Sequence, residues 1–99
     1  MIKEFEGDIK TLTQEEACIV DIWAEWCGPC KVTGKNLETF ATENPEVPIY
    51  KVDAEKYPDV AEHFGVMSLP TILYMEGEEV VWKHTGLMTA KQLKDKLGL

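Results

Sequence analysis

With 99 residues, 44% of them hydrophobic, the chain is long enough for one domain, spanning residues 1–99, and too apolar for a disordered protein. Its formal net charge of −8 at pH 7 argues against nucleic acid and against anionic membranes, because both attract basic surfaces. No apolar stretch approaches the roughly 20 residues of a membrane-spanning helix, and residues 1–5 lack signal-peptide character, so a cytoplasmic protein is the default expectation.

The first half of the chain alternates strand and helix signals. Residues 2–6 predict a short edge strand, and residues 13–16 fit a capping box that predicts one turn of helix. The run 18–24 is almost continuously apolar and β-branched, as in a strand covered on both faces. Residues 27–44 predict a helix, because a proline lies in the first turn and Asn-Pro follows the last. Residues 48–53 predict a second buried strand.

The second half adds two more helices and a hairpin. Residues from 59 begin a short helix that Gly65 stops. Residues 71–75 and 79–85 predict strands joined by a tight turn, and Thr89 caps a final amphipathic helix. The resulting α/β fold has a mixed central sheet flanked by helices on both faces. A strand–helix–strand crossover makes the first two buried strands parallel, while the last two strands must be antiparallel.

Two cysteines, Cys27 and Cys30, stand at the corner between the first buried strand and the helix after it. Open α/β sheets place their sites at such corners. Unpaired N–H groups and the helix dipole stabilise a thiolate there, so the pKa of Cys27 should be depressed and the residue nucleophilic. Cys30 lies one turn further and can face Cys27, which allows a small redox-active disulfide. Gly28 and Pro29 keep the corner tight.

Other interpretations of this pair remain open. A structural zinc site needs four ligands, which Cys27, Cys30, His63 and His84 would supply, but no second paired-ligand motif supports it. A non-catalytic adaptor would use an apolar surface for binding alone, and it would be expected to lack a cysteine or the buried acid. An isomerase or oxidant on the same fold would need a higher reduction potential. The third cysteine, Cys18, is expected in the core as a small hydrophobic residue.

An aspartate, Asp21, stands in the middle of the first buried strand. An ionised carboxylate is costly to bury, so the pKa of Asp21 should be raised. A carboxyl group that titrates near neutrality can accept a proton at the working pH. If the strand runs under the start of the helix, Asp21 lies beneath Cys30. The alternative is a structural aspartate that caps a chain turn.

Several segments resemble the thioredoxin family, and the resemblance covers nearly the whole chain. WAEWCGPCK at residues 23–31 resembles its active-site segment, residues 20–24 the strand before it, residues 50–53 the next strand, residues 68–71 the cis-proline loop, and Gly86 the glycine after the final strand. W-C-G-P-C favours reducing members over isomerases and oxidants. The resemblance implies a thioredoxin fold and reduction of protein disulfides through a reversible Cys27–Cys30 couple. It also implies disulfide-containing client proteins and a thioredoxin reductase-type electron donor, with no cofactor; a monomer is the default expectation.

The resemblance also implies residue roles. Cys27 is the nucleophile and Cys30 the resolving cysteine, while Asp21 accepts and donates the Cys30 proton, through water. Lys51 corresponds to the lysine that lies near this aspartate. A flat client-binding surface, with cis Pro70 presenting the backbone of its neighbour, is implied at Trp26, Gly28, Pro29, Leu69, Pro70, Gly86 and Leu87.

The chain departs from the family pattern inside the active-site helix. Lys35 stands where thioredoxins usually carry a proline, and Gly34 precedes it. A glycine in a helix interior costs about 1 kcal/mol relative to alanine. Helix stability and the reduction potential are therefore the properties that this departure affects most.

Overall fold

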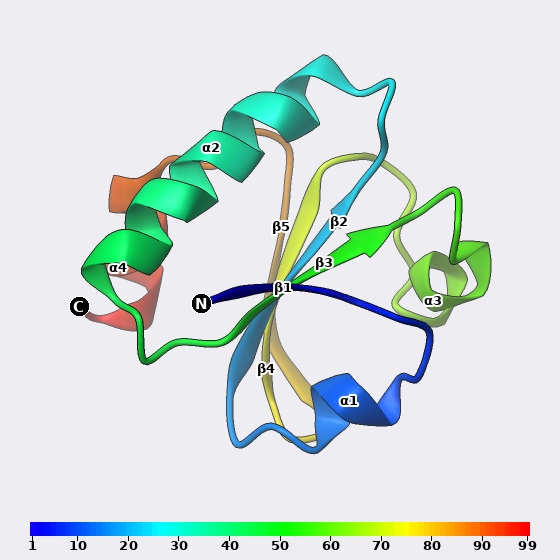
Figure 1. The fold of residues 1–99 in the computed structure, drawn as a ribbon, viewed down its shortest axis with the longest axis horizontal. Helices are drawn as coiled ribbons and strands as arrows, with labels where there is room; N and C mark the ends of the chain where they lie inside the picture. The colour runs from blue at the N-terminus through cyan, green and yellow to red at the C-terminus, as the bar shows by residue number, and fades with distance from the viewer.

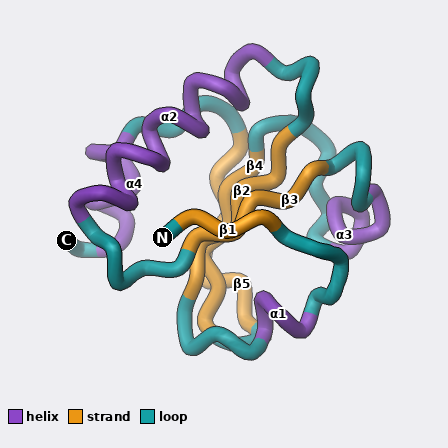
Figure 2. The backbone as a smooth tube through the Cα atoms, in the orientation of Figure 1, coloured by secondary structure: helices purple, strands orange, loops and turns teal.

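The computed structural model describes residues 1–99 and contains nine elements in the predicted order, β-α-β-α-β-α-β-β-α (Figures 1 and 2). The strands are β1 (Ile2–Glu4), β2 (Cys18–Trp23), β3 (Ile49–Asp53), β4 (Thr71–Glu76) and β5 (Glu79–Thr85). The helices are α1 (Lys10–Thr13), α2 (Gly28–Glu43), α3 (Pro58–His63) and α4 (Ala90–Leu97). None of these helices has the length and apolar character that a membrane crossing requires.

The five strands form one mixed sheet in the order β1-β3-β2-β4-β5. β2 pairs with β3 in parallel, and β4 pairs antiparallel with both β2 and β5, which confirms the predicted directions. β2 is therefore the central strand, with hydrogen-bonded neighbours on both sides. Its middle residue, Asp21, is in register with Lys51 on β3 and with Ile72 on β4.

Helices cover both faces of the sheet, also as predicted. Figure 1 shows α2 and α4 on one side and α1 and α3 on the other. Side chains alternate along β2, so Ile19 packs with Leu37 of α2 on the first face, while Val20 packs with Leu12 of α1 on the second. By the same alternation Asp21 faces the α2 side. The sheet thus places the one acidic residue of β2 under the active-site helix.

The predicted position of the first helix is wrong. Residues 13–16 do not begin a helix; Thr13 is the last residue of α1, and its hydroxyl donates to the Lys10 carbonyl at 3.4 Å. The start is stabilised instead by Asp8, whose carboxylate accepts the Lys10 N–H at 3.0 Å. β1 also ends at Glu4, earlier than predicted, because Gly7 with φ 113° turns the chain away soon afterwards. The capping box at Thr89 is confirmed.

Substituting alanine for Gly34 is expected to stabilise the protein by about 0.5–1 kcal/mol, because Gly34 lies inside α2 and pays the entropy cost of glycine in a helix. An added Cβ would meet only the end of the Lys51 side chain, with Nζ at 3.5 Å, an ordinary contact. Denaturant unfolding of wild type and Gly34→Ala measures the difference. Gly77→Ala is the matched control, and it should destabilise because Gly77 has φ +62°. A Gly34→Ala protein no more stable than wild type would contradict the expectation.

Candidate active site

The candidate site is built at the corner between β2 and α2. Cys27 is the N-cap residue of α2, with extended backbone angles (φ −89°, ψ 107°). Its Sγ accepts the N–H of Cys30 at 3.2 Å, and its own N–H donates to the Ala24 carbonyl at 3.2 Å. Pro29 occupies the first turn of the helix, where no N–H is needed. The sulfur of Cys27 therefore lies at the end of the helix where N–H groups stabilise a thiolate.

Cys27 and Cys30 are joined in a disulfide, so the structure shows the oxidised form of the pair. Their Cα atoms are 5.2 Å apart, inside the range that disulfides adopt. Both residues are nearly buried, with 4% and 3% of their surface exposed. The neighbouring Trp26 side chain is 69% exposed. The two sulfurs are therefore set into an apolar surface and do not project into solvent. A partner must bind flat against this surface to reach them.

Asp21 is fully buried, and neither carboxylate oxygen has a hydrogen-bond partner. Burial raises the pKa of Asp21 from its ordinary value of 3.8 to about 7; the charge of Lys51 opposes this rise, and the Glu4 carboxylate adds to it. The shift has the direction that the sequence predicts. A carboxyl group that titrates near pH 7 can hold or release a proton under physiological conditions.

Lys51 is next to Asp21 in the sheet but forms no ion pair with it. The Lys51 Nζ lies 4.8 Å from the centre of the Trp23 ring, a cation–π contact. Both residues line a cavity of about 260 Å³ that also contacts Cys30 and Gly34. Asp21 itself does not line this cavity. The Lys51 charge therefore acts on Asp21 without a hydrogen bond.

The predicted client-binding surface is brought together from three loops. Trp26, Gly28 and Pro29 are exposed at the corner, and Leu87 is 44% exposed after β5. Leu69 and Gly86 are half-buried. The Leu69–Pro70 peptide bond is cis, as the resemblance implies, but Pro70 itself is buried. Pro70 therefore supports the surface from beneath, and its neighbour Leu69 presents the accessible part of that loop.

Met67 lies beside this surface, although the sequence analysis assigned it no role. Its side chain is 97% exposed, and it borders an apolar groove of about 250 Å³ together with Trp26 and Leu69. The available signal was an apolar pair, Val66-Met67, in a loop between Gly65 and the proline. Apolar residues in such a loop are expected either to pack inward or to form a binding surface. Val66 is half-buried and packs against the core, whereas Met67 projects outward.

The third cysteine, Cys18, lies at the start of β2, at the other end of the strand from the Cys27 corner. Cys18 is buried, as predicted, and its Sγ lies 3.7 Å from the Leu12 carbonyl oxygen. Burial, with a smaller contribution from Glu15, raises the pKa of Cys18 to about 11, so its thiol is inert near neutral pH. No three histidine, cysteine or acidic side chains come together as a metal site would require.

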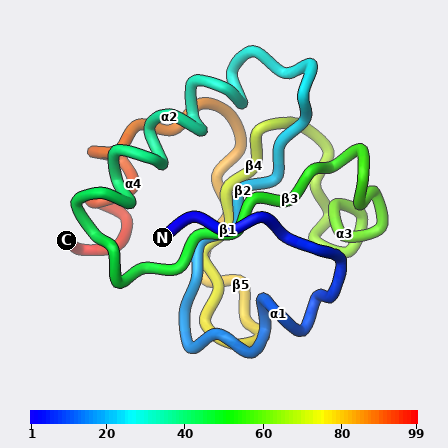
Figure 3. The backbone as a smooth tube through the Cα atoms, in the orientation of Figure 1, coloured from blue at the N-terminus to red at the C-terminus, as the bar shows by residue number.

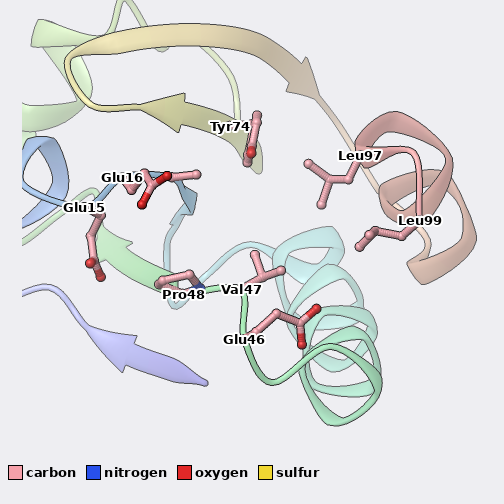
Figure 4. A pocket seen from close by; sticks show the side chains of 9 residues that line it. Glu15, Glu16, Glu46, Val47, Pro48, Tyr74, Leu97 and Leu99 are labelled. Carbon is pink, nitrogen blue, oxygen red and sulfur yellow. The ribbon is translucent and has the colours of Figure 1, made fainter.

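A separate hollow of about 350 Å³ lies between the approach to β2, the residues before β3 and the end of the chain (Figure 4). Glu15, Glu16 and Glu46 line it together with Leu97 and Leu99. It is at the opposite ends of the parallel strands from Cys27, and no cysteine lines it.

Known thioredoxins match this chain over nearly its full length. A family model for thioredoxin matches residues 2–98. The chain is 38% identical over 89 residues to putative thioredoxin 2 of Streptomyces coelicolor, an alignment that spans 90% of this chain and 66% of that protein. It is 34% identical over 101 residues to a thioredoxin of Chlorobaculum thiosulfatiphilum, covering 97% and 92% of the two chains. A solved structure of a mutant thioredoxin from Halobacterium salinarum superposes with a TM-score of 0.86 at 26% identity, covering 96% of this chain and 86% of that chain.

Proposed function

This chain belongs to the thioredoxin family and is a protein-disulfide oxidoreductase, and from that premise we propose that it acts as a reductant through a reversible Cys27–Cys30 couple. The observation that carries the proposal is the disulfide at the N-terminus of α2, within a W-C-G-P-C sequence. In the proposed reaction, reduction of a client leaves Cys27 and Cys30 joined as a disulfide. Electrons that restore the dithiol come from a reductase-type donor, as the family implies.

The first exchange begins with the reduced protein. The Cys27 thiolate attacks one sulfur of a client disulfide, and the client S–S bond breaks. The displaced client sulfur leaves as a thiolate and takes a proton from solvent, while a mixed disulfide joins Cys27 to the client. The helix N-terminus supports this step because it favours Cys27 in its anionic form.

The second exchange releases the client. Cys30 passes its proton, through water, to ionised Asp21, and the resulting thiolate attacks the Cys27 sulfur. The mixed disulfide breaks, the client leaves with two reduced sulfurs, and the Cys27–Cys30 bond forms with the loss of two electrons. The buried, unpartnered carboxyl of Asp21, with its pKa near 7, supports its assignment as this base. The charge of Lys51 assists by favouring ionised Asp21.

The surface around Cys27 is proposed to bind the client. Exposed Trp26 and Leu87, together with half-buried Leu69, offer apolar contacts to a client. The backbone of Leu69 would pair with an extended client segment. We also propose that residues 1–99 act as a single monomeric domain in the cytoplasm, because a reductant needs a compartment in which thiols are kept reduced.

The reduction potential of the Cys27–Cys30 pair tests the proposal. Equilibration with thiol–disulfide buffers, followed through the emission of Trp23 and Trp26, is expected to give a value below about −240 mV, at the reducing end of the range for such proteins. A value near −180 or −120 mV would assign the chain to isomerases or oxidants instead, since about 30 mV is a tenfold change in the equilibrium. Stoichiometric zinc in the purified protein would overturn the redox assignment altogether.

A further inference from the structure

Two side chains of α2 hold the backbone of a single residue in the loop after β5. The Met88 N–H donates to the Thr33 hydroxyl at 3.2 Å, and the Met88 carbonyl accepts from the Asn36 side-chain amide at 2.9 Å. Figure 3 shows this loop, in orange, passing alongside α2. Both polar groups of the Met88 peptide backbone are thus bound to the helix that carries Cys30. We call these two contacts the Met88 clamp.

The positions of the clamp residues follow from the helix repeat. Thr33 lies three residues after Cys30 and Asn36 three residues after Thr33, so all three lie close to one face of α2. Thr33 and Met88 are buried, with 0% and 1% exposed. A buried N–H without a partner is costly, so the Thr33 hydroxyl satisfies a group that an apolar residue of equal size would leave unpaired. A hydroxyl at this position is therefore used for a contact, not for packing alone.

The clamp holds the loop that forms part of the client surface. Gly86 and Leu87 directly precede Met88, and the Gly86 N–H donates to the Pro70 carbonyl at 2.8 Å. The loop is therefore attached at one end to the cis-proline loop and at the other end to the active-site helix. A local contact is also present, because His84 Nε2 lies 3.1 Å from the Leu87 carbonyl oxygen, but only the bonds to Pro70 and to α2 connect the loop to the rest of the client surface.

We propose that Thr33 and Asn36 are positioning residues for client capture, because the Met88 clamp holds the backbone that follows Gly86 and Leu87 against the helix that begins at Cys27, so that a client segment can contact all three. This rests on the proposed function, since it assumes that clients dock on that loop. A docked client needs its disulfide held close to the attacking sulfur, and a displaced loop loses this alignment. A small disulfide that reaches Cys27 without touching the loop gains nothing from the clamp.

The test compares two substitutions that separate the hydroxyl from the methyl group of Thr33. Thr33→Val keeps the shape and removes the hydrogen bond, whereas Thr33→Ser keeps the hydrogen bond and removes a buried methyl group. Steady-state reduction is measured with insulin as the protein disulfide and cystamine as the small one, using dithiothreitol as reductant. For Thr33→Val we expect the insulin KM to rise about fivefold, the effect of roughly one lost hydrogen bond, with cystamine unchanged. Thr33→Ser should have the wild-type insulin KM.

Two further variants complete the design. Asn36→Asp replaces the amide donor by a carboxylate that faces the Met88 carbonyl. It should raise the insulin KM in the same way as Thr33→Val. If Thr33→Val does not fold, the insulin KM of Asn36→Asp tests the proposal in its place. Thr39→Val is the matched control, because the Thr39 hydroxyl bonds only within α2, to the Lys35 carbonyl at 3.3 Å. It should leave both substrates unaffected.

The proposal is overturned if folded Thr33→Val reduces insulin with the wild-type KM, if Thr33→Ser is as impaired as Thr33→Val, or if both substrates are slowed equally. Equal slowing would mean that the substitution damages the helix and its cysteines. A wild-type protein that reduces neither insulin nor cystamine would instead refute the proposed function, before any variant is compared.

Discussion

Replacing Cys30 by serine is expected to stop turnover after the first exchange and to leave client protein covalently attached to Cys27. The Cys27 thiolate can still attack a client disulfide, but serine cannot resolve the mixed disulfide, because a hydroxyl group is far less acidic and less nucleophilic than a thiol. We expect the steady-state rate to fall by about 10³-fold or more. Non-reducing electrophoresis and intact mass measurement, with insulin as client, detect the adduct directly.

Controls for this experiment use the other two cysteines. Cys27→Ser should abolish both turnover and the adduct, because the proposed mechanism assigns the attack to the sulfur at the helix N-terminus. Cys18→Ser in the Cys30→Ser background should leave the adduct intact, since the Cys18 thiol is buried and its pKa is raised to about 11. An adduct that depends on Cys18, or one that forms through Cys30 when Cys27 is absent, would contradict the assigned order of attack.

Replacing Asp21 by asparagine is expected to stabilise the oxidised protein at alkaline pH. The folded-state pKa of Asp21, about 7, exceeds its ordinary value of 3.8, so the folded protein binds the proton more tightly than the unfolded chain. The contribution of Asp21 to stability is therefore greatest below pH 3.8 and falls as the pH rises toward and through 7, by about 4 kcal/mol in all. Asparagine has no charge to bury and does not undergo this loss.

Denaturant unfolding of both proteins between pH 4 and pH 8 measures the effect. The stability of Asp21→Asn minus that of wild type should increase across this range by about 4 kcal/mol. The oxidised form is used because disulfide-bonded Cys27 and Cys30 do not titrate, so their ionisation does not enter the difference. A difference that stays constant with pH would show that Asp21 titrates near its ordinary value and that the carboxyl is better solvated than its burial implies.

The same substitution should slow the second exchange. Release of a client from the mixed disulfide needs a base for the Cys30 proton, and asparagine cannot supply one, so we expect a loss of tenfold to about a hundredfold. In single-turnover measurements the wild-type rate should rise as Asp21 ionises near pH 7, and this inflection should be absent from Asp21→Asn. Formation of the mixed disulfide, which depends on Cys27, is the internal control and should keep its wild-type rate.

The features that could be predicted from the amino-acid sequence are those that depend on residues close together in the chain. The alternation of apolar runs and caps predicted the order of strands and helices, because each period depends on neighbouring residues. Cys27 and Cys30 were identifiable because a strand-to-helix corner and a three-residue spacing are both visible in the chain. Asp21 was identifiable because a charge in a buried strand violates the pattern around it. The first helix was predicted to begin at Thr13, where it ends in the structure. Gly7 turns the chain and Asp8 accepts the Lys10 N–H, so the helix begins earlier. The sequence alone does not show which of two neighbouring start signals is used.

Contacts between side chains that are distant in the sequence became visible only in the folded protein. Lys51 contacts the ring of Trp23 and does not pair with Asp21, an outcome that depends on how β2 and β3 pack together with α2. The Met88 clamp joins residues 52 and 55 positions apart, and a threonine on a helix carries no signal that its hydroxyl will be needed by a distant loop. Sequence periodicity records which face of an element is buried. It does not record what lies opposite, because that depends on how the chain closes its long-range contacts.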